Sequence, residues 1–430
     1  MNFQRWLFSL LIVSPLTVLL ADDWPQWRGP QRDAKSAEAG LFGNWDADGP
    51  PLAWTTAGIG EGYASVAVVG DRIYTTGNLP NGQVVSAIDV ANGKLVWQQQ
   101  VTRQPPKHGY EGSRCTPAVD GNRLYVVTSS GGIVCLQTAT GKIVWQRDFA
   151  DWNGKMMSGW GFSESPLVDG NRVICTPGGN KGTVVALNKV NGKEIWASQL
   201  PNFPQETGVN GDNLNDGAGY GSVVVSNGAG VKQYIQLVGR GLIGIRASDG
   251  APLWRYNKVA NGTANIPTAV VDGDYVFTST AYGTGSALLR LTKKGNQVQA
   301  EEVYWLDART LQNKHGGMVL VDGHIYCGTG NGDGLPTCLN MQTGEIAWGP
   351  ERGKGRGEAS LIYADGHLVI RRDDGTVMLV VATPEKFELK HSFMPEVQEG
   401  KSWAHPVIAG GRLYLREQNR LMAYELRSQI

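Results

Sequence analysis

The chain has 430 residues, of which 58 are glycine, 20 are proline and 18% are charged. Glycine is about twice as frequent as usual, which excludes a coiled coil or a helical bundle, because such chains are rich in Ala, Glu, Lys and Leu. A hydrophobic content of 41% can bury a large core and excludes a disordered chain. With 39 basic and 39 acidic residues, no global charge excess predicts binding to nucleic acid or to an anionic membrane.

The N-terminus has the order of a secretory signal. Arg5 precedes a mostly apolar run over residues 6–20, and the small residue Ala21 follows it. The run of about 15 residues is short for a membrane anchor, which needs about 20. We therefore expect a signal peptide over residues 1–21 and an exported protein, periplasmic or extracellular. No later segment is long and apolar enough to predict a membrane span.

A unit of about fifty residues repeats along the chain. One copy runs from Ser113 to Trp145 and the next from Ser165 to Trp196, with the same turn dipeptides at matching places. Each copy holds short runs rich in Val, Ile, Leu, Tyr and Trp, separated by Asp-Gly, Asn-Gly or Thr-Gly turns that suit tight hairpins. Eight copies are present, and glycines mark their first turns at Gly70, Gly121, Gly170, Gly228, Gly273, Gly323, Gly366 and Gly410.

Short antiparallel strands repeated in this way are typical of propeller blades. A helical solenoid is rejected because no segment shows a sustained helical period. We predict an all-β fold, an eight-bladed β-propeller of four-stranded antiparallel blades, over residues 55–430. The last unit lacks a final strand, and residues 50–54 supply one. Residues 22–54 are therefore predicted to close the ring and to remove its open edge.

Most units end in a tryptophan that follows an Asn-Gly-Lys type of turn. A large flat side chain there is expected to pack between neighbouring blades. Unit five is irregular, because Trp305 follows the run Glu301 to Tyr304 instead of such a turn. The regular positions are Trp97, Trp145, Trp196, Trp254 and Trp348.

The five cysteines are an odd number, so at least one has no partner within the chain. Cys327 and Cys338 flank a glycine-rich turn, and a hairpin centred there would set them opposite each other, where an exported protein could oxidise them. The alternative is that the cysteines are buried thiols that behave as small apolar residues. We favour the buried thiols.

The repeated unit of this chain resembles the pyrroloquinoline-quinone-like (PQQ-like) propeller repeat. The matching motif is the run from Ala87 to Trp97, together with the corresponding segments of the other units. The opening run from Trp24 to Pro30 resembles the N-terminal part of secreted family members of uncharacterised role. The family includes quinoprotein alcohol dehydrogenases and the lipoprotein scaffold of the outer-membrane assembly machinery, both eight-bladed. The resemblance implies the ring and is compatible with an enzyme or a scaffold, because one fold hosts both.

The chain departs from both branches of this family. Quinoprotein dehydrogenases often carry two adjacent cysteines beside the quinone and hold calcium with acidic and amide oxygens. The chain has no such cysteine pair, and we place no matching calcium ligands. The scaffold lipoprotein carries an acylated cysteine, which is missing here. PQQ and calcium therefore stay open as cofactors, no other metal site is expected, and no catalytic residue is assigned.

Two columns of residues lead into the inner strands of the units. The column nearer the axis holds Ser, Thr or Gly in seven units, as a crowded axis demands, and His405 in the eighth. The column two residues earlier faces the same way and is aromatic and charged. The alternative is that these residues only fill and hydrate the channel, with Arg114 and Glu358 neutralising each other. We predict a binding site at the channel mouth formed by Tyr63, Arg114, Tyr220, His315, Glu358, Trp403 and His405.

These features lead to one expected function and one alternative. We expect a binding or scaffold protein of the cell envelope that presents its mouth and loops to a protein partner or a small ligand. The alternative is a quinone-dependent dehydrogenase of alcohols or sugars, with PQQ in the mouth and calcium beside it. His315 and His405 are the candidates for acid–base groups in either case.

Overall fold

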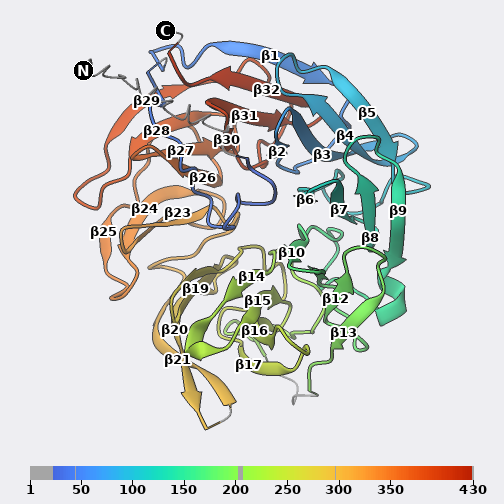
Figure 1. Cartoon of the computed structure of the whole chain (residues 1–430). Coiled ribbons are helices and arrows are strands. Elements are labelled where there is room, and N and C mark those ends of the chain that lie inside the picture. Colours follow the sequence, from blue (N-terminus) through green and yellow to red (C-terminus); the bar gives the residue numbers. More distant parts are fainter. Residues whose placement is uncertain (1–22, 44, 202–206, 296, 429–430) are drawn as a thin grey trace, which may run out of the picture.

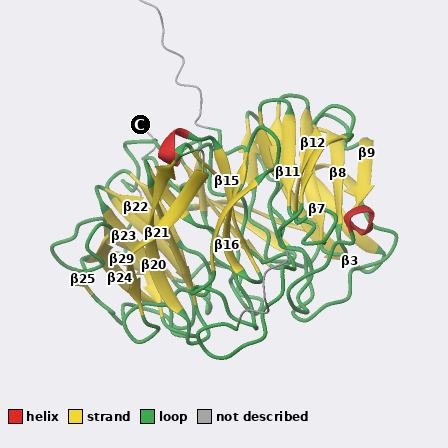
Figure 2. Cartoon of the chain, turned by 90° about the horizontal axis from the view of Figure 1, so that it is seen from below, coloured by secondary structure: helices red, strands yellow, loops and turns green. Residues whose placement is uncertain are grey.

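The computed structural model describes residues 23–428 apart from residues 44, 202–206 and 296, so the expected signal peptide lies outside the described residues. Thirty-two strands form eight four-stranded antiparallel sheets, arranged radially around one axis (Figure 1). Seen from the side, the strands run between two faces that are covered by loops (Figure 2). The predicted all-β, eight-bladed propeller is confirmed. Within the described ranges, no helix is long and apolar enough to cross a membrane.

The first seven blades take their strands in chain order, from the innermost outward (Figure 1). Blades one and two hold β2 (Ala67–Val69), β3 (Arg72–Leu79), β4 (Gly82–Asp89), β5 (Leu95–Gln100), β6 (Ala118–Asp120), β7 (Arg123–Thr128), β8 (Gly132–Gln137) and β9 (Ile143–Asp148). Blades three and four hold β10 (Leu167–Asp169), β11 (Arg172–Cys175), β12 (Val184–Asn188), β13 (Glu194–Ser198), β14 (Val224–Ser226), β15 (Gln233–Val238), β16 (Gly241–Arg246) and β17 (Pro252–Tyr256).

The remaining blades follow the same plan up to the ring closure. Blades five and six hold β18 (Val270–Asp272), β19 (Tyr275–Thr280), β20 (Gly285–Lys294), β21 (Gln297–Leu306), β22 (Met318–Val321), β23 (His324–Thr329), β24 (Leu335–Asn340) and β25 (Ile346–Trp348). Blade seven holds β26 (Ala359–Ala364), β27 (His367–Arg372), β28 (Val377–Val381) and β29 (Leu389–Phe393). Two short 3-10 segments, η1 (Phe149–Trp152) and η2 (Gly228–Gly230), lie outside the strands.

The eighth blade combines both ends of the chain. Its inner strands are β30 (Val407–Ala409), β31 (Arg412–Glu417) and β32 (Arg420–Glu425), and its outer strand is β1 (Leu52–Ala57). β1 pairs antiparallel with β32, with Ala57 opposite Arg420. Closure by an N-terminal strand is therefore confirmed.

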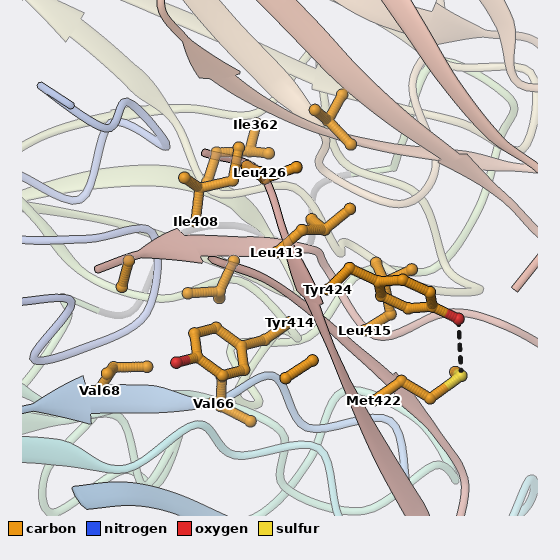
Figure 3. Close-up of a cluster of buried hydrophobic side chains, with 14 of the residues drawn as sticks. Val66, Val68, Ile362, Ile408, Leu413, Tyr414, Leu415, Met422, Tyr424 and Leu426 are labelled. Carbon is orange, nitrogen blue, oxygen red and sulfur yellow. Dashed lines mark hydrogen bonds between the residues drawn. The ribbon is translucent and has the colours of Figure 1, made fainter. Parts of the chain in front are cut away.

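The core around this closure joins residues from both ends of the chain. Val66 and Val68 of the first blade belong to the same buried cluster as Leu413, Tyr414 and Leu415 of the last (Figure 3). The three aliphatic residues of this group with the least exposure, Leu413, Leu415 and Val66, are at most 2% exposed. Each such side chain contributes about 1.5–3 kcal/mol when fully buried, so this apolar interface holds the first and last blades together.

Seven of the eight predicted turn glycines adopt the left-handed conformation that a tight hairpin turn requires. Their φ values run from 55° at Gly273 to 76° at Gly323, a region that costs glycine little because it lacks a Cβ atom. Blade four differs from the prediction. Its first turn is the longer η2 segment, in which Ala229 rather than Gly228 takes the positive φ, at 57°.

Four of the five regular tryptophans donate their indole N–H to a carbonyl of the next blade, as predicted: Trp97, Trp145, Trp196 and Trp348. Trp254 differs, because its Nε1 donates to Gln233 Oε1 of its own blade at 2.7 Å. Trp97 Nε1 donates a hydrogen bond to the Thr138 carbonyl of the following blade at 2.9 Å. A Cβ atom on Gly141 would lie 2.5 Å from the Trp97 ring, so the turn must present a glycine there. In the irregular blade five, Tyr304 makes this contact instead of Trp305, with its hydroxyl donating to the Met341 carbonyl at 2.7 Å.

All five cysteines are buried free thiols, so the interpretation that we favoured is confirmed. Cys327 lies opposite Thr337, and Cys338 lies opposite Tyr326. The two cysteines occupy neighbouring pairs of the ladder, and successive side chains of a strand point to opposite faces. The expectation that a hairpin would set them opposite each other was wrong by one residue of register.

We predict that Trp97→Ala lowers the free energy of unfolding by about 3 kcal/mol, the lower end of the range for removing a large aromatic side chain, because Trp97 is only partly buried. Urea denaturation followed by circular dichroism measures this loss. Val96→Ala is the control, because Val96 lies next to it on β5 and is 45% exposed. A change in the control as large as that in Trp97→Ala would contradict the interblade role of the indole.

Candidate functional site

The N-terminal segment closes one end of the central channel. Trp24 forms a β-bridge with Val68 of β2, and residues 34–36 continue beside Tyr363 of β26. Between these two anchors the segment crosses the axis of the ring, among the inner strands β2, β26 and β30 (Figure 1). The run from Trp24 to Pro30, for which the sequence showed only a resemblance to secreted family members, therefore has a structural role at the axis.

Two arginines fix this segment to the inner strands. Arg28 donates to the carbonyls of Gly316 at 2.9 Å and Met318 at 2.5 Å, in blade six. Arg32 donates to the carbonyls of Ser165 at 2.7 Å and Pro166 at 3.0 Å, in blade three. Burial lowers the pKa of each guanidinium to about 10, so both remain charged at neutral pH. Backbone carbonyls thus take the place of water around these two buried charges.

The small residues of the inner column form a hydrogen-bonded arc around the axis. The backbone N–H of each of four residues donates to the hydroxyl of the next blade, at 2.9 to 3.1 Å. The arc ends before Gly317, where a Cβ atom would lie 2.8 Å from Ser360 Cα. The hydroxyls therefore hold the inner strands in register, which explains why the column is small and polar. The arc contains Ser65, Thr116, Ser165, Ser222 and Thr268.

Above this arc lies a cavity of about 370 Å³, which we call the mouth cup. Trp27 of the N-terminal segment and His405 lie in its wall with their ring centroids 4.6 Å apart. Trp27 Nε1 also donates to Thr268 Oγ1 at 3.3 Å. Because the segment that carries Trp27 crosses the axis, the channel becomes a pocket that opens on one face. The other principal lining residues are Tyr63, Tyr110, Arg114, Trp160, Tyr220, Ile266, Tyr282, Lys314, His315 and Trp403.

Aromatic rings form most of the cup wall. Trp403 lies at the centre of one cluster, with centroid distances of 4.9 Å to Tyr63, 5.0 Å to Tyr110 and 5.1 Å to His315. The Trp403 indole is held in place because its Nε1 donates to Asp373 Oδ1 at 2.7 Å. A second pair, Trp160 and Tyr220, lies 5.9 Å apart. The rings meet at angles of 40° to 88°, so they form a concave wall rather than parallel plates.

Two cations accompany these rings. Arg114 donates to the Trp160 and Tyr110 carbonyls and lies 5.3 Å from the Tyr63 ring centroid. Lys314 Nζ lies 5.3 Å from the Tyr282 ring centroid and 3.3 Å from Glu358 Oε1. Glu358 thus pairs with Lys314 and not with Arg114, which corrects the alternative of mutual neutralisation. Burial raises the pKa of Glu358 to about 7, so its carboxylate neutralises Lys314 only partly at neutral pH.

Both histidines of the cup are uncharged at neutral pH. Burial, followed by repulsion from neighbouring cationic groups, lowers the pKa values of His315 and His405 to about 3. His405 Nε2 lies 3.0 Å from the His315 carbonyl, which only accepts hydrogen bonds, so we assign the proton to Nε2. At neutral pH these rings can form hydrogen bonds and van der Waals contacts with a ligand, but they are weak bases.

Six of the seven predicted mouth residues line the cup: Tyr63, Arg114, Tyr220, His315, Trp403 and His405. Glu358 does not line it, because its side chain is turned into the protein toward Lys314. Sequence reasoning missed Trp27, Tyr110, Trp160 and Tyr282, which lie outside the repeated column. Of these four, only Trp27 belongs to a motif that the sequence showed, the opening tryptophan motif. The other three lie in loops whose sequences do not repeat from unit to unit.

The cup does not fit the calcium that a quinoprotein dehydrogenase needs beside its quinone. Among the described lining residues there are two cations and no carboxylate. Likewise, the described part of the chain contains no group of three or more His, Cys, Asp or Glu side chains placed to hold a metal ion. Calcium prefers several carboxylate and carbonyl oxygens, whereas this wall offers rings and positive charge. We therefore derive no chemistry through PQQ and calcium.

The eight blades, their interblade tryptophans and the closing N-terminal strand define a protein of the PQQ-like propeller class. A family model described as "Outer membrane protein assembly factor BamB" matches residues 80–350. This match extends over more than half of the chain, and the chain belongs to that family.

Curated relatives show the same affiliation over parts of the chain. The chain is 27% identical to the outer membrane protein assembly factor BamB of Burkholderia pseudomallei over 278 residues, which cover 55% of this chain and 68% of the relative. The corresponding protein of Kangiella koreensis is 27% identical over 150 residues. That match spans about a third of each protein, 34% in both cases. The quinoprotein alcohol dehydrogenase PedH of Pseudomonas putida is 27% identical over 134 residues, which cover 29% of this chain and 20% of PedH.

Solved structures share the fold at low sequence identity. BamB from Moraxella catarrhalis matches with a TM-score of 0.59 and 14% identity, over 88% of this chain and 98% of that chain. Quinohemoprotein alcohol dehydrogenase from Comamonas testosteroni matches with a TM-score of 0.64 and 14% identity, over 95% of this chain and 81% of that chain. Because BamB and the dehydrogenase match about equally well, the fold does not choose between their functions.

We predict that the ring resonances of His315 and His405 do not titrate between pH 8 and pH 4. The folded pKa values of about 3 lie below the ordinary value of 6.5, so the unfolded chain binds more protons between these values. Each histidine should therefore reduce the folding stability as the pH falls from 6.5 toward 3, by about 1.4 kcal/mol per pH unit at most. NMR titration checks the first statement, and urea denaturation of His315→Phe against wild type checks the second. A midpoint near pH 6.5 for either ring would contradict both.

Proposed function

We propose that this protein is an exported binding protein of the cell envelope and that the mouth cup is its recognition site. The signal-like order of residues 1–21 supports export. Membership of the BamB family supports a place in the envelope, since relatives bear the name outer membrane protein assembly factor. The partner is a protein or a small ligand that enters the mouth.

The mouth cup carries this proposal. Pockets with apolar and aromatic walls and a few fixed polar groups are typical binding sites. The cup has these properties, and the N-terminal segment gives it a floor. Its histidines are weak bases, and Glu358 is held by Lys314, so the wall favours binding over proton transfer.

Photo-crosslinking tests whether the cup is occupied in the cell. We expect a photoreactive phenylalanine analogue at position 110 to form a discrete adduct with a protein or a glycan, because Tyr110 lines the cup and is 59% exposed. Position 190 is the control, since Val190 is 54% exposed in a turn between outer strands, away from the mouth. Equal labelling at both positions, or none at position 110, would contradict the proposed recognition site.

The alternative of a quinone-dependent dehydrogenase has a direct test. We expect purified protein to show no saturable binding of PQQ in the presence of calcium and no quinone-dependent reduction of a dye with alcohols or sugars, because the cup wall lacks a carboxylate among its described residues. Spectrophotometric titration with PQQ and calcium measures both. Saturable binding together with dye reduction would replace the binding proposal by the enzyme.

A further inference from the structure

We propose that the mouth cup binds an acidic saccharide, with pyranose rings against its aromatic walls and a carboxylate beside Arg114. This assignment rests on the proposed function, because it names the ligand class of the same site. It follows from three properties of the cup: the arrangement of its rings, the hydroxyls of its floor and the sign of its charge.

The rings form a curved apolar surface that matches a puckered ring better than a flat one. Tyr63 and Trp403 are tilted by 40°, Tyr110 and Trp403 by 63°, and Trp160 and Tyr220 by 62°. A flat polycyclic ligand could lie parallel to only one of these tilted faces at a time. A pyranose instead presents C–H groups on both faces and at its edge, and such groups pack against aromatic faces set at angles.

The floor provides hydrogen-bonding groups of the kind that recognise sugar hydroxyls. Thr268 Oγ1 accepts from the Ser222 backbone and from Trp27 Nε1, and a hydroxyl that accepts twice still carries one proton to donate. Ser222 also lines the cup and accepts from the Ser165 backbone. A cavity of 370 Å³ lies near the lower end of the range for small-ligand pockets, about 300–1,000 Å³. It is suited to the end of a glycan.

The positive charge of the cup wall favours a negatively charged ligand. Arg114 donates to backbone carbonyls and lies against the Tyr63 ring, so its charge is solvated by neutral groups. Mostly buried charges are normally paired with an opposite charge. Among the described residues of the wall, no carboxylate serves this purpose for Arg114. A carboxylate on the ligand would supply the missing charge, as a uronic acid does.

The test compares an acidic disaccharide with its neutral counterpart. We expect α-1,4-linked digalacturonic acid to bind saturably in isothermal titration calorimetry, at least about tenfold more tightly than α-1,4-linked galactobiose, a ratio that corresponds to about 1.4 kcal/mol. Its affinity should fall as the salt concentration rises, because the charge contribution is screened.

Trp403→Ala should weaken the binding of digalacturonic acid at least about tenfold, whereas Trp403→Phe, which keeps an aromatic face, should weaken it less. Trp348→Ala is the matched control, since Trp348 bonds to the Thr383 carbonyl between outer strands. It should lower the unfolding temperature and leave the affinity unchanged while the protein is folded.

Equal affinities for the two disaccharides, no saturable binding of the acidic one, or an unchanged affinity in Trp403→Ala would each overturn the saccharide assignment. A protein adduct at position 110 together with no digalacturonic acid binding would overturn the assignment and leave the proposed recognition site standing. Absence of any adduct at position 110 would contradict that site itself.

Discussion

The N-terminal segment closes the ring of blades both at its rim and at its axis, and the fold and the mouth cup both require this closure. Without β1 the last blade would end at β32, and β1 completes it as a fourth strand, so that both ends of the chain lie in one sheet. The segment that leads to β1 crosses the axis first, where Arg28 and Arg32 bind carbonyls of blades six and three. One stretch of chain thus closes the ring at its rim and ties blades three and six together at its centre.

Buried arginines recur in the blades next to the closure. Arg416 of β31 donates to Thr75 Oγ1 at 2.7 Å and to Gly60 O at 2.7 Å, so blade eight is bonded to blade one. Arg371 of β27 forms an ion pair with Glu417 at 2.5 Å, and neither side chain is exposed. Removing one partner of such a pair leaves an uncompensated buried charge, which is costly. These contacts fix the neighbours of the closing blade in one arrangement.

The same segment that closes the ring also shapes the candidate site. Without Trp27 and the residues around it, the centre of the propeller would be a channel, and with them it is a cup with a floor. The walls of the cup are formed by loops of different blades. The sequences of these loops can differ because the strands, and not the loops, stabilise the fold. A repeated scaffold therefore holds a site whose residues do not repeat.

Much of the fold could be predicted from the sequence because its causes are local. A turn glycine with positive φ, a tryptophan after a tight turn and alternating apolar strands each act within a unit, and repetition makes them visible. Irregular positions limited this reasoning: Tyr304 takes the docking role expected near Trp305, and Cys327 and Cys338 differ from opposite pairing by one residue. Six of the predicted mouth residues could be found because they repeat at one register of the units: five stand two residues before the small residues of the inner strands, and His405 stands in the column of those small residues.

The number of blades, the strand that closes the ring and most of the predicted mouth residues could be read from the sequence alone. Three features needed the folded chain to become visible: the opening tryptophan motif crosses the axis, Glu358 turns to Lys314, and Tyr110, Trp160 and Tyr282 join the wall. The reason is physical: spacing within a unit fixes local geometry, whereas contacts across the axis join residues hundreds of positions apart. Arg28 and Met318 are separated by 290 positions, and no local pattern records their contact.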